Sequence, residues 1–157
     1  MTFYYAPTSL SDRLCGDNED IILSFKTINQ KSVVSICKEK TGRYIVYRSG
    51  SKDKVELQFP NKLDKTSWSF FHYSGQWRFG GKANAGFGDL VLKFTNMGTT
   101  YRIFQEWNDE GNSSKFGLQV EKPGLKAKYL VVDKSSLLGS LMQLNELPQI
   151  KNEADNE

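Results

Sequence analysis

The segment from Phe70 to Gly88 holds the residues whose types and spacing best suit recognition chemistry. Five glycines in it alternate with aromatic and basic side chains. Glycine lets a backbone approach another surface closely, and tyrosine, tryptophan and arginine are enriched at binding hot spots. The pattern predicts a partner-binding loop, and the alternative interpretation is a hairpin or bulge corner whose aromatic residues belong to the core. The candidate partner-binding residues are Tyr73, Ser74, Gly75, Trp77, Arg78 and Lys82.

A second chemistry to consider is nucleophilic catalysis by Ser74 with His72, the only histidine of the chain. Two residues apart on a strand, the two side chains would share one face of a sheet. A hydrolase also needs an acid that orients the imidazole, and the sequence singles none out. The Gly-x-Ser-x-Gly turn of many hydrolases is missing as well. We therefore expect no catalytic residues and a protein that is not an enzyme.

Metal and cofactor sites are not expected either. Zinc needs three or four cysteine, histidine or carboxylate ligands, and one histidine with two separated cysteines does not form such a set. The acids of 17–20 and 108–110 lack the spacing of a calcium-binding loop. Gly80 and Gly81 do not open a helix, so they form no nucleotide-binding motif.

The charge of the chain is mildly basic and unevenly placed. Lysine and arginine total 21 against 18 aspartate and glutamate, which gives a net charge of +3. Four of the acidic residues lie within residues 146–157, so the rest of the chain has a higher positive net charge than the whole chain. A basic body suits an acidic partner or a polyanion. Because the basic residues form no cluster and the aromatic residues form no RNA-stacking motif, we expect no nucleic acid partner.

The elements that must position these residues are mostly strands, because apolar residues alternate far more often than they recur at helical spacing. Short turns separate the strands, and such turns join antiparallel neighbours. The pattern predicts an all-β fold, an antiparallel β-sandwich or barrel of about eight or nine strands, in a single domain over 15–145. The candidate strands cover 21–26, 32–37, 43–48, 55–59, 68–73, 90–94, 100–107, 116–120 and 128–132.

Three segments depart from the strand pattern. Apolar residues of 135–144 recur at helical spacing behind a serine pair, which predicts one short C-terminal helix. The acidic tail 146–157 is predicted to be disordered. Residues 1–14 form a leader that is either an edge strand or flexible. Sheet edges must be covered by the helix, by the leader or by a second copy, and the last option is a homodimer.

No stretch approaches the roughly 20 apolar residues of a membrane-spanning helix, so no membrane span is expected. The N-terminus lacks the layout of a signal peptide, and we expect that the starting Met replaces a native signal. The two cysteines, Cys15 and Cys37, can close one disulfide or remain two unrelated buried thiols. Their spacing alone does not decide between these alternatives.

Several segments, taken in order, resemble a group of small exported all-β proteins of bacteria. They cover most of 23–107 and read Leu23-Ser24-Phe25-Lys26-Thr27, Val33-Val34-Ser35-Ile36-Cys37, Tyr44-Ile45-Val46-Tyr47-Arg48-Ser49-Gly50, Val55-Glu56-Leu57-Gln58-Phe59-Pro60, Tyr73-Ser74-Gly75, and Leu92-Lys93-Phe94 before Tyr101. In that group a cysteine at the position of Phe25 pairs with the one that matches Cys37. The resemblance therefore implies a disulfide in which Cys15 takes the place of the missing partner.

The Ser74-Gly75 loop is similar to the loops with which periplasmic lysozyme inhibitors plug an active site. This resemblance implies a periplasmic or secreted protein of the bacterial envelope. It would act as an inhibitor or immunity protein that neutralises a cell-wall hydrolase or toxin by inserting the loop 74–82. Clefts of glycan hydrolases hold paired carboxylates, which Arg78 and Lys82 can meet with charge. The alternative is a carbohydrate- or ligand-binding envelope module that stacks its ligand on Tyr73 and Trp77.

Overall fold

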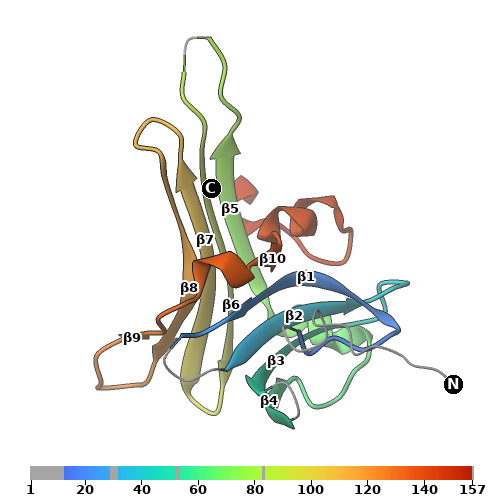
Figure 1. The fold of residues 1–157 in the computed structure, drawn as a ribbon. Coiled ribbons are helices and arrows are strands. Elements are labelled where there is room, and N and C mark those ends of the chain that lie inside the picture. The colour runs from blue at the N-terminus through green and yellow to red at the C-terminus, as the bar shows by residue number, and fades with distance from the viewer. Residues whose placement is uncertain (1–12, 29–31, 52–53, 83, 157) are drawn as a thin grey trace, which may run out of the picture. The chain divides into compact units, whose positions relative to one another are not determined.

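The structure, a computed structural model, describes residues 13–28, 32–51, 54–82 and 84–156. The chain divides into two compact units, Met1–Ser67 with Val131–Gly139 and Trp68–Leu130 with Ser140–Glu157. Each unit holds one antiparallel sheet of five strands (Figure 1). The predicted all-β antiparallel class is confirmed, and the described strands form two sheets, as a β-sandwich requires. Most of the predicted leader, residues 1–12, lies outside the described residues.

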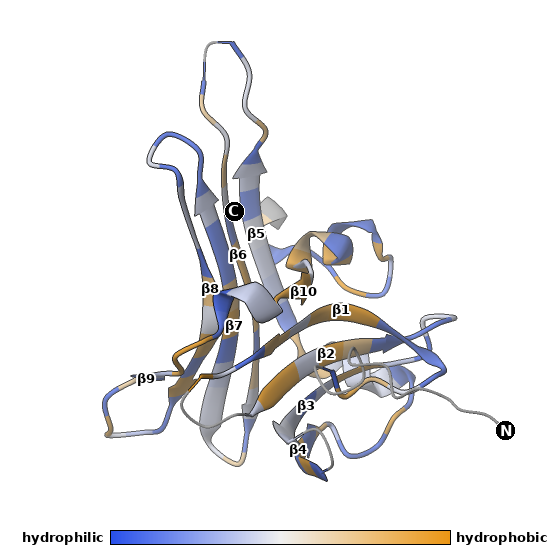
Figure 2. Ribbon diagram, viewed as in Figure 1, coloured by the Kyte–Doolittle hydropathy of each residue, from blue (hydrophilic) through white to orange (hydrophobic). Residues whose placement is uncertain are grey.

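The first unit has the strand order β10-β1-β2-β3-β4. β1 and β2 carry apolar runs because buried residues lie on both of their faces, and Figure 2 shows both strands as strongly hydrophobic. The short strand β10 was not predicted. Gly139 in it has φ +79°, and a side chain there would overlap the backbone of Ile22. The strands are β1 (Glu19–Lys26), β2 (Val33–Glu39), β3 (Ile45–Ser51), β4 (Lys54–Phe59) and β10 (Leu138–Gly139).

The second unit has the strand order β5-β6-β7-β8-β9. The predicted strand 68–73 is wrong at its start, because a 3-10 helix, η2 (Lys65–Phe70), precedes β5. Asp64 starts that helix, since its carboxylate accepts the N–H of Thr66 at 2.9 Å. The strands are β5 (His72–Arg78), β6 (Phe87–Asn96), β7 (Thr99–Asn108), β8 (Ser113–Glu121) and β9 (Lys128–Tyr129).

Strand register gives the second sheet two chemically different faces. Residues directly opposite one another on neighbouring strands point to the same face. One row across the sheet joins Tyr73, Leu92, Ile103 and Leu118, all of which are buried. The rows on either side of it point to the other face, which is largely polar. β5 therefore alternates between core and solvent with a period of two.

The predicted single helix over 135–144 is replaced by three short elements. These are η3 (Lys134–Ser136), β10, and η4 (Leu141–Glu146), and both helices are of the 3-10 type. The apolar spacing was real, because Leu141 and Leu144 are buried. Asp133 and Ser140, however, each cap the helix that follows them, and the chain between the two helices is extended. In the described residues, no helix is long and apolar enough to cross a membrane.

The tail predicted to be disordered is ordered through Asn156 and ends in the 3-10 helix η5 (Glu153–Asn156). Asn152, only 8% exposed, holds it to β5. Its side chain accepts the N–H of Gly75 at 3.0 Å and donates to the carbonyl of Gly75 at 2.9 Å. The amide side chain of Asn152 thus satisfies both backbone hydrogen-bonding groups of Gly75. These bonds explain how a mostly polar segment is held on β5 without burying much apolar surface.

Asn152→Ala is expected to lower the free energy of unfolding by about 2 kcal/mol, because it leaves buried backbone groups of Gly75 without partners. Urea denaturation measures this loss. Lys151→Ala, at the exposed neighbouring position, is the control and should change the stability by less than about 0.5 kcal/mol. Equal stability of both variants would show that the tail is not held by Asn152.

Candidate functional site

The predicted partner-binding residues do not form one loop, because most of them lie on strand β5. Tyr73 and Gly75 point to the buried face, and the hydroxyl of Tyr73 accepts a hydrogen bond from Asn145 at 2.8 Å. Trp77 follows on the same face and is half-buried. Ser74 and Arg78 point to the opposite face. The structure therefore separates the predicted residues into a core set and an exposed set.

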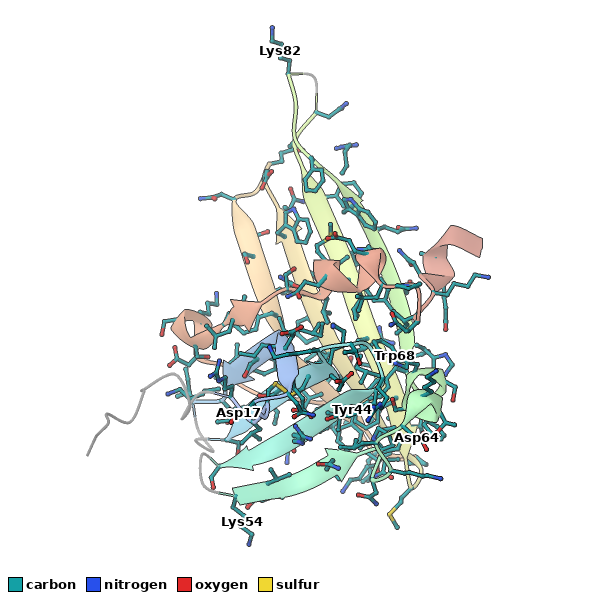
Figure 3. All side chains as sticks on the ribbon, turned by 90° about the vertical axis from the view of Figure 1, so that its right-hand side faces the viewer. Asp17, Tyr44, Lys54, Asp64, Trp68 and Lys82 are labelled. Atoms are coloured by element: carbon teal, nitrogen blue, oxygen red, sulfur yellow. A yellow bond between two sulfur atoms is a disulfide. The ribbon has the colours of Figure 1, made fainter. Side chains whose placement is uncertain are left out.

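The exposed part of the predicted segment lies in the long β5–β6 hairpin beyond the two strands, where residues 79–82 and Asn84 are exposed. It extends past the neighbouring β7–β8 hairpin (Figure 1), with Lys82 near its end (Figure 3). Phe79, at its base, is 73% exposed and is one of the most exposed large apolar side chains among the described residues. A projecting element with an exposed aromatic residue and a basic tip is a typical protein-recognition surface.

Internal hydrogen bonds connect the described residues of the two arms of this hairpin. Arg78 donates to the carbonyl of Ala85 through Nε at 3.1 Å and Nη2 at 2.8 Å, and its guanidinium lies 5.2 Å from the ring centroid of Phe87. Gly81 donates to Asn84 at 2.9 Å within the turn. Arg78, predicted to meet a partner, thus braces the hairpin itself. Pre-organisation of this kind lowers the entropy cost of binding.

Gly86 is required for the close approach of the two hairpin arms. A Cβ at this position would lie 2.8 Å from the nitrogen of Gly80 and 2.6 Å from a carboxylate oxygen of Asp109. The carbonyl of Gly86 also accepts the N–H of Asp109 at 2.9 Å, which ties the hairpin to the adjacent end of β7. Gly86 therefore serves the shape of the hairpin. Phe79 belongs to the same aromatic pattern of the sequence but is not among the predicted partner-binding residues.

His72 has an acidic partner that the sequence could not single out. Its Nδ1 lies 2.8 Å from Oε2 of Glu153, and both side chains are about half exposed, at 51% and 49%. Ser74 is on the same face, but in the described part of the chain its hydroxyl makes no hydrogen bond with His72. The pair is thus an exposed link between β5 and η5, and its two residues are 81 positions apart in the sequence.

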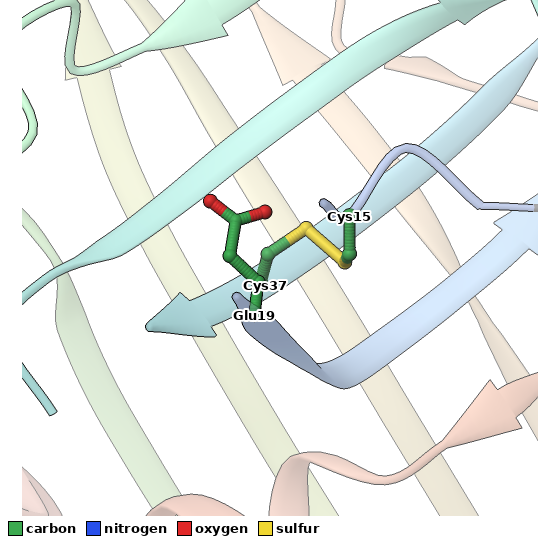
Figure 4. Close-up of side chains that lie close together, drawn as sticks. All are labelled: Cys15, Glu19 and Cys37. Carbon is green, nitrogen blue, oxygen red and sulfur yellow. A yellow bond between two sulfur atoms is a disulfide. The ribbon is translucent and has the colours of Figure 1, made fainter. Parts of the chain in front are cut away.

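The disulfide Cys15–Cys37 is formed, with the two Cα atoms 5.6 Å apart, and it fits a protein of an oxidising, extracytoplasmic environment. Glu19 lies beside it (Figure 4), and the donor atoms of the three residues are within 4.8 Å of one another. The arrangement is not a metal site, because the sulfur atoms are bonded to each other. The carboxylate of Glu19 is occupied by hydrogen bonds instead.

Glu19 and Arg48 form a buried ion pair that sequence reasoning missed. The guanidinium contacts both carboxylate oxygens, at 2.6 and 3.0 Å, and the two side chains are 2% and 11% exposed. Tyr44 donates its hydroxyl to Glu19 at 2.6 Å, and the N–H of Gly16 donates at 2.7 Å. Burial alone would raise the pKa of Glu19, but the hydrogen bonds from Arg48, Tyr44 and Gly16 outweigh it and hold the pKa below its ordinary value.

No protein-family model, curated protein or solved structure matches this chain. What defines the protein is therefore its own fold and surface. It is an all-β, disulfide-bonded protein whose described residues form two antiparallel sheets and a projecting β5–β6 hairpin.

Proposed function

We propose that this protein is an inhibitor or immunity protein of the bacterial envelope, periplasmic or secreted, that inserts the β5–β6 hairpin into the cleft of a cell-wall hydrolase or toxin. The observation that carries the proposal is the exposed Phe79 on a hairpin that Arg78 braces from within. The aromatic ring supplies apolar area at the entrance of a cleft. Lys82 brings a positive charge to the end of the hairpin, where the paired carboxylates of a glycan hydrolase would lie.

The entropy cost of ordering a binding loop favours a hairpin that is already folded before the partner binds. A loop that is ordered only in the complex loses part of its binding energy to ordering, whereas a braced hairpin has already met that cost during folding. The disulfide supports an extracytoplasmic location, where cell-wall hydrolases act. Together these features favour a rigid, plug-like inhibitor over a flexible tether.

Phe79→Ala and Lys82→Ala are each expected to weaken partner binding at least tenfold, because hot-spot side chains cost about 2 kcal/mol or more when truncated. Immobilised protein captures its partner from a bacterial envelope extract, and release of soluble peptidoglycan fragments measures the activity of the captured hydrolase. The wild type should suppress that activity and the variants should not. Leu125→Ala with Lys126→Ala is the matched control, since it removes an exposed leucine and an exposed lysine from another loop of the same unit.

The alternative function, a carbohydrate-binding module, is favoured by one observation. Trp77 is half-buried. Gly88 on β6 is directly opposite Trp77 of β5 on one side and Trp107 of β7 on the other. Tyr73, however, is fully buried and offers no stacking surface. If the wild type sediments with purified peptidoglycan and leaves every captured hydrolase active, the inhibitor proposal is wrong and the module is favoured.

A further inference from the structure

The solvent face of the second sheet carries an open groove of about 360 Å³ that lies outside the projecting hairpin. β5, β6, β7 and η5 line it. Ser74 and Val91, which are directly paired, form one row of its lining, and His72, Lys93 and Arg102 form the next row. The groove thus combines one apolar side chain and one hydroxyl group with a row of basic side chains, and Gln76, Asp89 and Glu153 complete its lining.

The row of basic side chains is electrostatically unfavourable when no anion is bound to it. Lys93 is directly opposite His72 on one side and directly opposite Arg102 on the other. Directly opposite side chains of neighbouring strands have Cβ atoms about 5 Å apart, and like charges in such positions are destabilising. An opposite charge placed between Lys93 and Arg102 would convert this repulsion into attraction.

The two acids that line the groove, Asp89 and Glu153, do not supply that charge. Glu153 is engaged with His72 at 2.8 Å. Asp89 is four residues from Lys93 along β6, a separation of roughly 13 Å on an extended strand. Within the described part of the chain, neither Lys93 nor Arg102 has an ion-pair partner. Other cations of the same face do find one, since Lys115 lies 3.6 Å from Glu106.

The register that creates this pair is fixed by a tight turn. Met97 and Gly98 connect β6 to β7 with φ values of 52° and 82°, which matches a two-residue hairpin turn. Such a turn leaves no freedom to shift the strands by one residue, which would move Lys93 and Arg102 out of opposition. The paired cations are therefore a fixed feature of the sheet.

We propose that this groove binds a small molecule through an oxyanion group, a carboxylate or a phosphate, held between Lys93 and Arg102. Arg102 offers a planar fork of donors that matches the two oxygens of such a group, and Lys93 adds a second charge. Ser74 donates a hydroxyl to a third oxygen or to a neighbouring polar group of the ligand. Val91 contacts the apolar part. This site is independent of the hairpin and of the function proposed for it.

Inorganic phosphate and acetate are the probes, titrated separately into the isotopically labelled wild type at low ionic strength. The amide signals of residues 91–93 and 102–104 should shift and saturate with at least one anion, and the tighter anion identifies the preferred oxyanion. Lys93→Gln and Arg102→Gln should each weaken binding about tenfold or more, as expected for loss of a charge-assisted hydrogen bond. Lys93→Gln should fold at least as stably as the wild type, because it removes a like-charge neighbour.

Lys115→Gln is the matched control, because Lys115 lies on the same face but already has an acidic partner. Unchanged binding in this variant supports a localised site. Equal weakening in Lys115→Gln and Arg102→Gln would show attraction to general surface charge and overturn the proposal. So would the absence of saturable binding with both anions, or identical shifts with sodium chloride at matched ionic strength. Failure of the hairpin variants to alter partner binding has no bearing on this result.

Discussion

Arg48→Met is expected to lower the free energy of unfolding by about 3–5 kcal/mol, the largest effect of any single substitution considered for this protein. The variant leaves the carboxylate of Glu19 buried beside the disulfide without its counter-ion. It also removes the donors to the carbonyl of Leu14, at 3.0 Å, and to Gln58, at 2.8 Å. Arg48 thus ties the segment before β1 to β3 and β4, and urea denaturation of the variant measures the loss of all these contacts together.

Two controls separate this buried pair from ordinary surface charge. Lys40→Ala removes one of the two lysine partners of Asp20, in an exposed pair at 3.0 Å, and it should cost less than about 1 kcal/mol. Glu19→Leu combined with Arg48→Met removes both charges at once. This double variant should be more stable than Arg48→Met alone, because no uncompensated charge remains. If the double variant is the less stable one, the hydrogen bonds to neighbouring groups matter more than the charge.

The pH dependence of stability gives an independent test of Glu19. Because its folded-state pKa lies below the ordinary value of 4.5, the pair stabilises the fold above that pH. This contribution is lost as the pH falls through the folded-state pKa. The stability difference between the wild type and Glu19→Gln should therefore shrink as the pH is lowered below 4.5. A difference that stays constant with pH would contradict the depressed pKa.

The second large effect is expected from the disulfide. Cys15→Ala with Cys37→Ala should lower the free energy of unfolding by about 3 kcal/mol, because the bond closes a loop of 22 residues and limits the freedom of the unfolded chain. The bond also holds Leu14 where its N–H reaches the hydroxyl of Ser35 at 2.9 Å. Urea denaturation of the oxidised wild type, the reduced wild type and the double variant gives the comparison.

The expected order of stability is oxidised wild type first, with reduced wild type and double variant similar to each other. Reductant should leave the double variant unchanged, which excludes general effects of the reagent. Thiol titration of the unfolded, unreduced wild type should detect no free thiol. Two free thiols, or a reduced protein as stable as the oxidised one, would refute the structural role of the bond.

The local pattern of the sequence determined most of the strands and their antiparallel connection. Alternation over 100–107 and 116–120 is a property of neighbouring residues, and β7 and β8 form where it occurs. Apolar spacing was misleading at Trp68 and Ser135, because the carboxylates of Asp64 and Asp133 accept local backbone hydrogen bonds that favour 3-10 turns over the predicted element. In a short segment, the hydrogen bonds of a capping side chain determine the local structure more strongly than the spacing of its apolar residues.

The candidate site was predicted only in part. The glycines and aromatic residues after Tyr73 predicted a partner-binding loop, with a hairpin or bulge corner as the alternative, and the structure places a hairpin at the end of β5. The phase of β5 buries Tyr73 and leaves Ser74 in solvent, and Phe79 is exposed because it lies beyond the end of the strand at Arg78. A one-residue change of phase exchanges the two faces, so composition alone could not select the exposed set.

Sequence by itself thus determined the class of fold, the turns and the position of the hairpin, because these follow from the preferences of residues close together in the chain. Tertiary structure alone decided the partners of Glu19, Gly75 and His72. Arg48 is 29 residues from Glu19, Asn152 is 77 from Gly75, and Glu153 is 81 from His72. Such pairs form only after the strands have packed, since burial and register, not sequence proximity, bring the charged and polar groups within reach.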